Sequence, residues 1–275
     1  MRHQAAEDAK REIGPRLAAR GVDTGVANVA RVYDFLLGGK DNFAADRAVA
    51  ERVLAEVPHS ALACRQNREF LGRAVTYLAD QGVRQFLDIG SGLPTRDNVH
   101  EIAQRADPGA VVVYADCDPV VVAHARALLA KGAPGVLAVE GDVRDPDGII
   151  AGAKELLDFS EPVGVLLFAI LHFLTDADDP RGIVAALAAG LATGSAVAIS
   201  HLTADGTAPG KSRAAQRAYE DASAPAVPRT LPDITLLLEG LDIAEPGVTD
   251  INLWPARSLG PAAPLTFYGG VGWKP

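Results

Sequence analysis

The pattern of apolar and polar positions along the chain changes near residue 84. Before that point apolar residues recur at helical spacing, and the pattern predicts one helix over 42–57 and a second over 60–80. The second helix has the i, i+3, i+4, i+7 spacing of a buried face, at Leu71, Ala74, Val75 and Leu78. Residues 1–25 are polar and alanine-rich with no clear period, so we expect a weak helix or a loose arm there.

After residue 84, short apolar runs alternate with helical stretches. The runs predict strands at 85–89, 111–115, 135–139, 163–168 and 196–200. The helical stretches lie near 98–106, 119–131, 147–158 and 180–191. Alternation of this kind is typical of a parallel sheet with helices on both faces.

The last quarter of the chain departs from this alternation. Residues 203–230 combine a polar helical stretch with a proline-rich loop, and we interpret them as an insertion after the fifth strand. Two extended segments, 242–254 and 265–273, predict an antiparallel pair at one edge of the sheet. We therefore expect a single α/β domain. A helical cap covers 1–82, and a core over 83–275 holds a mostly parallel, seven-stranded sheet with an antiparallel C-terminal edge.

Composition and charge narrow the classes of function. The 275 residues are 48% hydrophobic and 22% charged, which is typical of a globular protein. A formal net charge of −9 disfavours nucleic acid and anionic membranes as partners. The N-terminus has no apolar signal-peptide core, and no run is apolar enough for a membrane helix, so we expect a cytoplasmic protein. Neither Cys64 nor Cys117 has a neighbour at metal-ligand spacing, and we expect no metal. No feature indicates an oligomeric state.

The strand predicted over 85–89 ends in an acid and then a loop of small residues. Ligands of open parallel sheets bind at the carboxyl ends of the strands, and glycines let a ligand approach the backbone closely. A dinucleotide fingerprint needs a third glycine at position 95, and a carboxylate at position 88 repels a pyrophosphate but suits an ammonium group. Both facts favour S-adenosylmethionine over a dinucleotide, and a tight turn that binds nothing is the plain alternative. The predicted contacts are Asp88, Gly90, Ser91, Gly92 and Thr95.

Acids also close the next two predicted strands. Asp116 can accept both hydroxyls of a ribose, whereas Asp118 is explained as the cap of a helix that begins at Pro119. Asp142 can accept a hydrogen bond from the amino group of adenine, although Gly-Asp after a strand is by itself a turn signal. Three acids at the ends of three successive strands are more specific than any one of them. We also expect cofactor contacts from Cys117, Val143 and, at the end of the fourth strand, Phe168.

Six segments carry a resemblance to a known family. They are ARVYDFLLGGKDNFAADR (30–47), FLDIGSGLPTRDNVHEIAQ (86–104), VVYADCDPVVVAHARALL (112–129), GDVRDP (141–146), LLFAILHFL (166–174) and YGGVGWKP (268–275). The chain resembles the actinobacterial S-adenosyl methyltransferase family, formerly a domain of unknown function, within the class I superfamily. The resemblance implies a Rossmann-like methyltransferase fold and S-adenosylmethionine as cofactor, but no known methyl acceptor. The superfamily usually has a small residue where this chain has Pro94.

The segment YDFLLGGKDNF precedes the first predicted strand. N-terminal helices cover the cofactor in similar methyltransferases, so the resemblance implies that Tyr33 lies near the sulfonium and that Asn42 or Lys40 meets the cofactor carboxylate. Further candidates for that carboxylate are Arg31 and Arg73. The alternative is structural, with Gly38-Gly39 as a turn between helices, Asn42 as a cap and Tyr33 as a half-buried aromatic side chain.

His172 follows the fourth predicted strand, at the place where methyl acceptors usually meet the cofactor. Imidazole titrates near neutral pH, so His172 is the candidate general base. A structural histidine that ties a loop to the next helix is the alternative. Methyl transfer depends mainly on proximity and alignment, so no base is obligatory.

Missing motifs narrow the acceptor. No Asp/Asn-Pro-Pro-aromatic sequence and no Pro-Cys pair follow the fourth predicted strand, which disfavours methylation of nucleic-acid bases. We predict S-adenosylmethionine-dependent methyl transfer to a small-molecule acceptor, such as a specialised metabolite. The helices of 28–80, His172 and the 203–230 insertion are expected to form the acceptor side. The alternative is a sensor that binds S-adenosylmethionine or its demethylated product without turnover.

Overall fold

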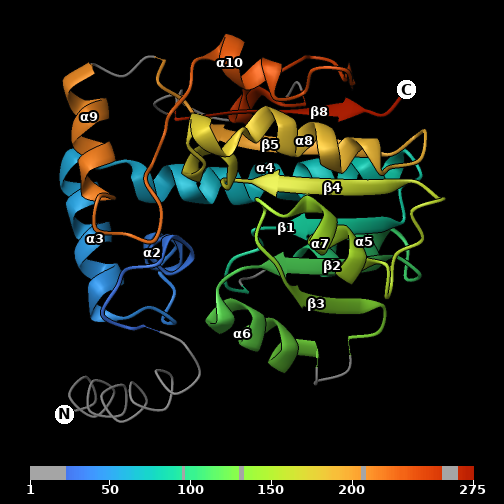
Figure 1. Ribbon diagram of the computed structural model, residues 1–275, viewed down its shortest axis with the longest axis horizontal. Coiled ribbons are helices and arrows are strands. Elements are labelled where there is room, and N and C mark those ends of the chain that lie inside the picture. Colours follow the sequence, from blue (N-terminus) through green and yellow to red (C-terminus); the bar gives the residue numbers. More distant parts are fainter. Residues whose placement is uncertain (1–22, 95–96, 130–132, 206–208, 256–265) are drawn as a thin grey trace.

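A mixed sheet forms the centre of the molecule in the computed structural model, which describes residues 23–94, 97–129, 133–205, 209–255 and 266–275 (Figure 1). Its strand order is β3-β2-β1-β4-β5-β8-β6, and β7 pairs with β8 outside this path. Five strands run parallel: β1 (Gln85–Ile89), β2 (Val111–Asp116), β3 (Val136–Glu140), β4 (Val163–Phe168) and β5 (Ala196–Leu202). The antiparallel edge consists of β6 (Asp242–Ile243), β7 (Thr249–Asp250) and β8 (Phe267–Trp273).

The predicted α/β class, the five parallel strands and the antiparallel C-terminal edge are confirmed, but the number of strands is wrong. Within the described ranges the sheet has eight strands, because the extended segment expected over 242–254 is broken into β6, β7 and a short 3₁₀ helix at Ile251–Leu253. A turn separates the two strands, where the Gly247 amide donates to the carbonyl of Ala244 at 2.8 Å. Pro246 has no amide hydrogen to offer a strand, and Gly247 has a φ of 92° that favours glycine.

Helices cover both faces of the sheet (Figure 1). One face packs against α4 (Ser60–Asp80) and α5 (Val99–Ala106). The other packs against α7 (Pro146–Ala153), α8 (Pro180–Ala189) and α10 (Leu231–Leu236). The remaining helices are α2 (Val29–Leu36), α3 (Ala44–Glu56), α6 (Pro119–Leu129) and α9 (Pro209–Ala218).

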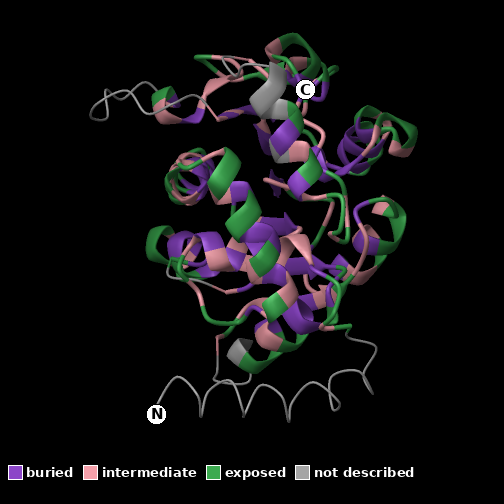
Figure 2. Ribbon diagram, turned by 90° about the vertical axis from the view of Figure 1, so that its left-hand side faces the viewer, coloured by how far each residue is buried: buried purple, intermediate pink, exposed green. Residues whose placement is uncertain are grey.

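Alternation along the strands divides the core into two layers, because successive side chains of a strand point to opposite faces. On β1, Phe86 belongs to the layer of α4 and α5, whereas Leu87 belongs to the layer of α7 and α8. On β4, Leu166 and Leu167 divide in the same way. Figure 2 shows buried residues in the strands and on the helix faces that meet them. These two apolar layers hold the ends of the parallel strands in fixed positions.

The described helices of the predicted cap over 1–82 pack in two different places. Phe70, Ala74 and Leu78 of α4 pack into the main core against the sheet, so this helix is a layer of the core. A separate apolar cluster joins α2, α3 and α9, with Val32, Val53 and Ala218 among its buried members. The predicted insertion at 203–230 thus packs against the N-terminal helices through α9. The arm expected over 1–25 lies almost entirely outside the described residues.

Candidate active site

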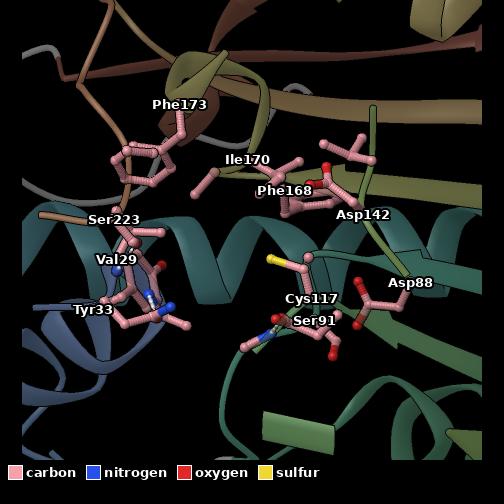
Figure 3. Close-up of a pocket in the computed structure, with 18 of the residues that line it drawn as sticks. Val29, Tyr33, Asp88, Ser91, Cys117, Asp142, Phe168, Ile170, Phe173 and Ser223 are labelled. Carbon is pink, nitrogen blue, oxygen red and sulfur yellow. Dashed lines mark hydrogen bonds between the residues drawn. The ribbon is translucent and has the colours of Figure 1, made fainter. Parts of the chain in front are cut away.

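A cavity lies between the carboxyl ends of the parallel strands and helix α2 (Figure 3). The empty space between its walls, including the open mouth, is about 1130 Å³. One wall comes from the ends of β1, β2, β3 and β4, and the opposite wall comes from α2, α4 and the insertion. Ten residues predicted from the sequence line it: Tyr33, Asp88, Gly90, Ser91, Gly92, Asp116, Cys117, Asp142, Val143 and Phe168.

The loop after β1 requires its two glycines. Gly90 and Gly92 have φ values of 70° and 65°, in the left-handed region that other residues adopt at a cost. A Cβ atom on Gly90 would lie 2.8 Å from a side-chain carbon of Ile170, so a larger residue would also displace the wall of the cavity. The Gly90 amide donates to the carbonyl of Ala115 at 2.8 Å, which ties the loop to β2.

Asp116 at the end of β2 is a buried carboxylate with two backbone partners. It accepts hydrogen bonds from the Gly92 amide and from the Asp118 amide, each at 2.9 Å. Burial raises the pKa of Asp116 to about 6, and the same amides act in the opposite direction. The carboxylate thus faces the cavity and shapes the β1 loop at the same time.

Asp88 at the end of β1 is buried and lines the same cavity. Burial raises the pKa of Asp88 to about 7, Arg68 lowers it, and the Asp116 carboxylate raises it further. Within the described part of the chain its side chain accepts no hydrogen bond. A buried carboxylate of this kind is stabilised by a cationic ligand. Figure 3 shows Asp88 on the same side of the cavity as Ser91, Cys117 and Asp142.

Asp142 follows β3 and is held in place by its neighbour. Its carboxylate accepts a hydrogen bond from the Arg144 amide at 2.9 Å and another from the Arg144 guanidinium at 2.8 Å. The same guanidinium pairs with Asp178 at 3.2 Å. Val143 beside it is buried, and Phe168 at the end of β4 is 7% exposed. This corner therefore combines an anchored acid with apolar surfaces.

Helix α2 forms the opposite wall and is attached by buried ion pairs. The Arg31 guanidinium lies 3.1 Å from an Asp46 oxygen on α3 and 3.4 Å from an Asp118 oxygen at the start of α6. Tyr33 projects from the same helix toward the cavity, and its hydroxyl donates to the Cys64 carbonyl at 3.0 Å. The same oxygen accepts a hydrogen bond from the Asn67 amide at 3.0 Å. These contacts fix the position of the Tyr33 ring.

Two predicted residues of the described ranges do not line this cavity. Asn42 is buried, but its amide donates to the Asp34 carboxylate at 2.8 Å and to the Gly39 carbonyl at 3.2 Å, so it closes the turn between α2 and α3. The other is His172. Thr95 lies outside the described residues. Of the other candidates for the cofactor carboxylate, Arg73 instead donates to the carbonyls of Trp254 and Ile251.

His172 lies in a 3₁₀ helix, Leu171–Phe173, and lines a neighbouring cavity. Its Nδ1 accepts a hydrogen bond from the Leu202 amide at 3.3 Å, so the proton of the neutral ring is on Nε2. Burial lowers the pKa of His172 well below its ordinary value, and His201 and Arg229 lower it further. A ring with this proton arrangement donates from Nε2 and cannot accept a proton there. This arrangement favours Nε2 as a hydrogen-bond donor, and the role of His172 as general base stays a prediction.

Several lining residues were missed by the sequence analysis. Asn67 and Arg68 sit on the polar part of α4, one helical turn before Leu71, and that position relative to the strand ends was the available signal. Ile170 and Phe173 come from the loop after β4. Ser223 reaches the cavity from the insertion, and no local pattern indicated that contact.

Two other kinds of site are absent from the residues that the structure describes. Among them, no group of three or more His, Cys, Asp or Glu side chains is arranged to hold a metal ion. Within the same ranges, no helix combines the length and apolar character that crossing a bilayer takes.

Two solved structures are similar over nearly the whole chain. A protein from Thermobifida fusca YX described as a methyltransferase shares 38% identity and a TM-score of 0.86, over 92% of this chain and 97% of its own. A DUF574 family protein from Streptomyces avermitilis shares 38% identity and a TM-score of 0.87, over 92% of this chain and 99% of its own. Human N-acetylserotonin methyltransferase, solved with S-adenosylmethionine, shares 15% identity and a TM-score of 0.50, over 90% of this chain and 63% of its own. This last likeness shows the fold alone.

The sheet, the glycine loop and the strand-end acids define a class I S-adenosylmethionine-dependent methyltransferase. The model of the S-adenosyl methyltransferase family matches residues 15–275, and the chain belongs to this family. The predicted family, fold class, enzyme class and cofactor are thereby confirmed. No curated protein matches the chain.

Proposed function

We propose that S-adenosylmethionine binds along the ends of β1, β2 and β3, and that its methyl group is transferred to a small-molecule acceptor at the α2 side of the cavity. The observation that carries this proposal is the buried Asp88 carboxylate, which has no hydrogen-bond donor among the described residues and faces the same space as the Gly90–Gly92 loop. A ligand with an ammonium group supplies the charge that this carboxylate requires.

Each strand end then has a distinct binding role. Asp88 holds the amino group of the cofactor beside the Gly90–Gly92 loop, Asp116 accepts hydrogen bonds from the ribose hydroxyls, and Asp142 accepts one from the adenine amino group. Asp116 retains lone pairs for a ribose beside its two backbone donors, because each carboxylate oxygen can accept two hydrogen bonds. Val143 and Phe168 provide apolar surfaces beside the purine ring.

The catalytic contribution of this chain is orientation. When bound, the cofactor supplies an electrophilic methyl group on a sulfonium, so the protein has only to align an acceptor and exclude water. The Tyr33 ring is held in place by the hydrogen bonds of its hydroxyl with Cys64 and Asn67. Phe173 and Ile170 line the same cavity. Arg31 keeps α2 attached to the start of α6 through Asp118. No general base among these residues is required, because an attacking hydroxyl becomes strongly acidic as its oxygen takes the methyl group, and its proton then leaves to solvent.

A small molecule is the acceptor that this site favours. The formal net charge of −9 opposes binding of nucleic acid. The acceptor side lies under α2 and the insertion, which together leave space for a compact ligand. Cys64 and Cys117 are free thiols, which supports a reducing compartment, and we propose the cytoplasm.

A sensor that binds the cofactor without turnover is not favoured, since the chain belongs to a methyltransferase family. Calorimetric titration of the purified protein with S-adenosylmethionine, S-adenosylhomocysteine and NAD tests the proposal. We expect binding of the first two and not of NAD. Tight binding of NAD without any response to the other two ligands would refute the assignment of the cavity.

A further inference from the structure

A second cavity adjoins the first on the side of α2. Its empty space, including the mouth, is about 680 Å³. Val29, Tyr33 and Phe173 line both cavities, so the two cavities meet at these three side chains. Figure 3 shows the three residues together on the side of the first cavity that lies away from Asp88 and Asp142. A ligand in the second cavity would therefore approach the cofactor from the side opposite the strand-end acids.

No charged side chain lines this second cavity in the described part of the chain. Its walls come from α2, α3, α4, the insertion and β8, and they are mainly aliphatic and aromatic. Val53, Ala63 and Cys64 are buried members of the apolar layers that enclose it. Neither a carboxylate nor an ammonium group would find an opposite charge here, and an unpaired charge is costly to bury.

Four rings form a continuous aromatic wall along one side. The Phe173 ring lies 4.4 Å from the His172 ring and 5.6 Å from the Tyr219 ring, measured between centroids. The His172 ring lies 5.9 Å from that of Phe267. All four residues line the second cavity. Aromatic rings pack most favourably against another aromatic surface, so this wall fits a planar aromatic ligand.

His172 adds one polar group to this wall. Because Nδ1 accepts the Leu202 amide, Nε2 carries hydrogen and is available as a donor. Arg229 and His201 pack behind it, where the Arg229 guanidinium lies 3.1 Å from His201 Nε2. The ring is therefore fixed as a neutral donor that can hold an oxygen atom of a ligand.

We propose that this second cavity binds the methyl acceptor and that the acceptor is an uncharged, planar aromatic molecule bearing a hydroxyl group. The inference rests on the proposed function, because it assumes that the first cavity holds S-adenosylmethionine. A phenol satisfies the site, since it is neutral at pH 7 with a pKa of about 10. A protonated amine or a carboxylate does not, because the cavity offers neither charge a partner.

The transfer balances without a further reactant. A lone pair of the hydroxyl oxygen forms the new O–C bond while the C–S bond breaks, and its electron pair remains on sulfur, which becomes a neutral thioether. The hydroxyl proton leaves to water. Val29, Tyr33 and Phe173 lie where the two cavities meet, so they contact both reactants and help to align them.

Three probes with one ring system test the class of ligand: 2-naphthol, 2-naphthoate and 2-naphthylmethylammonium. Binding is measured by calorimetry with S-adenosylhomocysteine present. We expect 2-naphthol to bind more tightly than either charged probe by about tenfold or more. When S-adenosylmethionine replaces S-adenosylhomocysteine, we also expect 2-naphthol to be methylated to 2-methoxynaphthalene. Equal or tighter binding of a charged probe, no binding of 2-naphthol, or binding without methyl transfer would overturn the proposal.

Variants that fill the cavity locate the site. Gln216 on α9 and Val57 after α3 line the second cavity but not the first. Gln216→Trp and Val57→Phe are expected to weaken 2-naphthol binding by about tenfold or more while S-adenosylhomocysteine still binds. Arg213→Trp is the control, because Arg213 is exposed on the same helix and lines neither cavity. Full 2-naphthol affinity in both filled variants refutes the second cavity, whereas failure of the parent to bind S-adenosylhomocysteine refutes the proposed function instead.

Discussion

The carboxylate of Asp116 lies 2.9 Å from the amide nitrogen of Gly92, so the end of β2 holds the loop that follows β1. The other oxygen of the same carboxylate accepts the Asp118 amide at the start of α6. One buried acid therefore fixes two backbone segments of the cavity before any ligand is present. Preorganisation of this kind lowers the entropy lost when a cofactor binds.

This relationship predicts the effect of removing the carboxylate. Asp116→Ala should weaken S-adenosylhomocysteine binding by about 1.5–3 kcal/mol, the range for a hydrogen bond to a charged group. The fold should survive, because the two layers of the core do not include Asp116. Calorimetry gives the affinity, and circular dichroism checks the fold. Asp80→Ala, at the exposed end of α4, is the matched control. Unchanged affinity in Asp116→Ala would remove this residue from the ribose site.

The raised pKa of Asp88 predicts a pH dependence of cofactor binding. Its value of about 7 in the free protein means that the carboxyl is largely protonated at pH 6 and largely ionised at pH 8. A cationic ligand binds the ionised form, so affinity should fall as pH falls. Between pH 8 and pH 6 we expect a loss of about twentyfold in S-adenosylhomocysteine affinity, measured by calorimetry, of which about tenfold comes from Asp88 and about twofold from Asp116.

Asp88→Asn separates this effect from that of its neighbour. The variant should bind more weakly at pH 8 and lose only about twofold down to pH 6, the share expected from Asp116 with its pKa of about 6. A parent protein whose affinity does not change between these pH values would show that Asp88 does not meet the ammonium group.

The burial of the neutral His201 ring predicts that the protein loses stability in acid. Its Nδ1 donates to the Leu202 carbonyl at 2.7 Å, and its Nε2 accepts from Arg229 at 3.1 Å, an arrangement that only the neutral ring permits. Burial lowers the pKa of His201 from 6.5 to about 4, the Leu202 carbonyl raises it, and Arg229 lowers it. As pH falls below 6.5, the unfolded chain takes up this proton before the folded protein does. The contribution of His201 to the free energy of unfolding is therefore fully present above pH 6.5 and is lost as the pH falls toward about 4.

Chemical unfolding of the ligand-free protein measures this loss. From pH 7 to pH 5 the parent should lose about 2 kcal/mol more free energy of unfolding than His201→Gln, which keeps an acceptor for Arg229 but does not titrate. The comparison between parent and variant cancels the contributions of Asp88, Asp116 and His172. Equal losses in the two proteins would mean that His201 is not held neutral in the folded state.

The sequence predicted the strands and the strand-end acids because both depend on local patterns. A buried parallel strand is a short apolar run, and its final residue must lie at the ligand-binding edge of the sheet. Asp88, Asp116 and Asp142 were therefore assigned correctly to one edge, and the structure places all three on one cavity. The break between β6 and β7 was missed, although Pro246-Gly247 is a turn signal in the sequence.

Side-chain direction is what the sequence could not predict. Asn42 is close to the site in the chain, yet Asp34 on the preceding helix takes its amide. His172 follows β4 as expected, but the Leu202 amide of β5 fixes its ring toward the second cavity. Both outcomes depend on partners from other elements, and neither partner is visible in the local pattern. Ser223 likewise reaches the cofactor cavity through the packing of the insertion against other elements, which no local pattern shows.

The last prediction concerns helix α2. Val29, Ala30 and Tyr33 line the cofactor cavity, while Arg31 joins the helix to α3 through Asp46 and to the start of α6 through Asp118. A bound cofactor would contact the helix and the strand-end loop together, so local opening of α2 should become less frequent. Hydrogen exchange with and without S-adenosylhomocysteine measures this change. We expect added protection in 29–36 and in the loop 90–92, and little change in α10, which lines neither cavity. If the loop gains protection and α2 does not, this helix is a fixed wall of the site and does not close over the ligand.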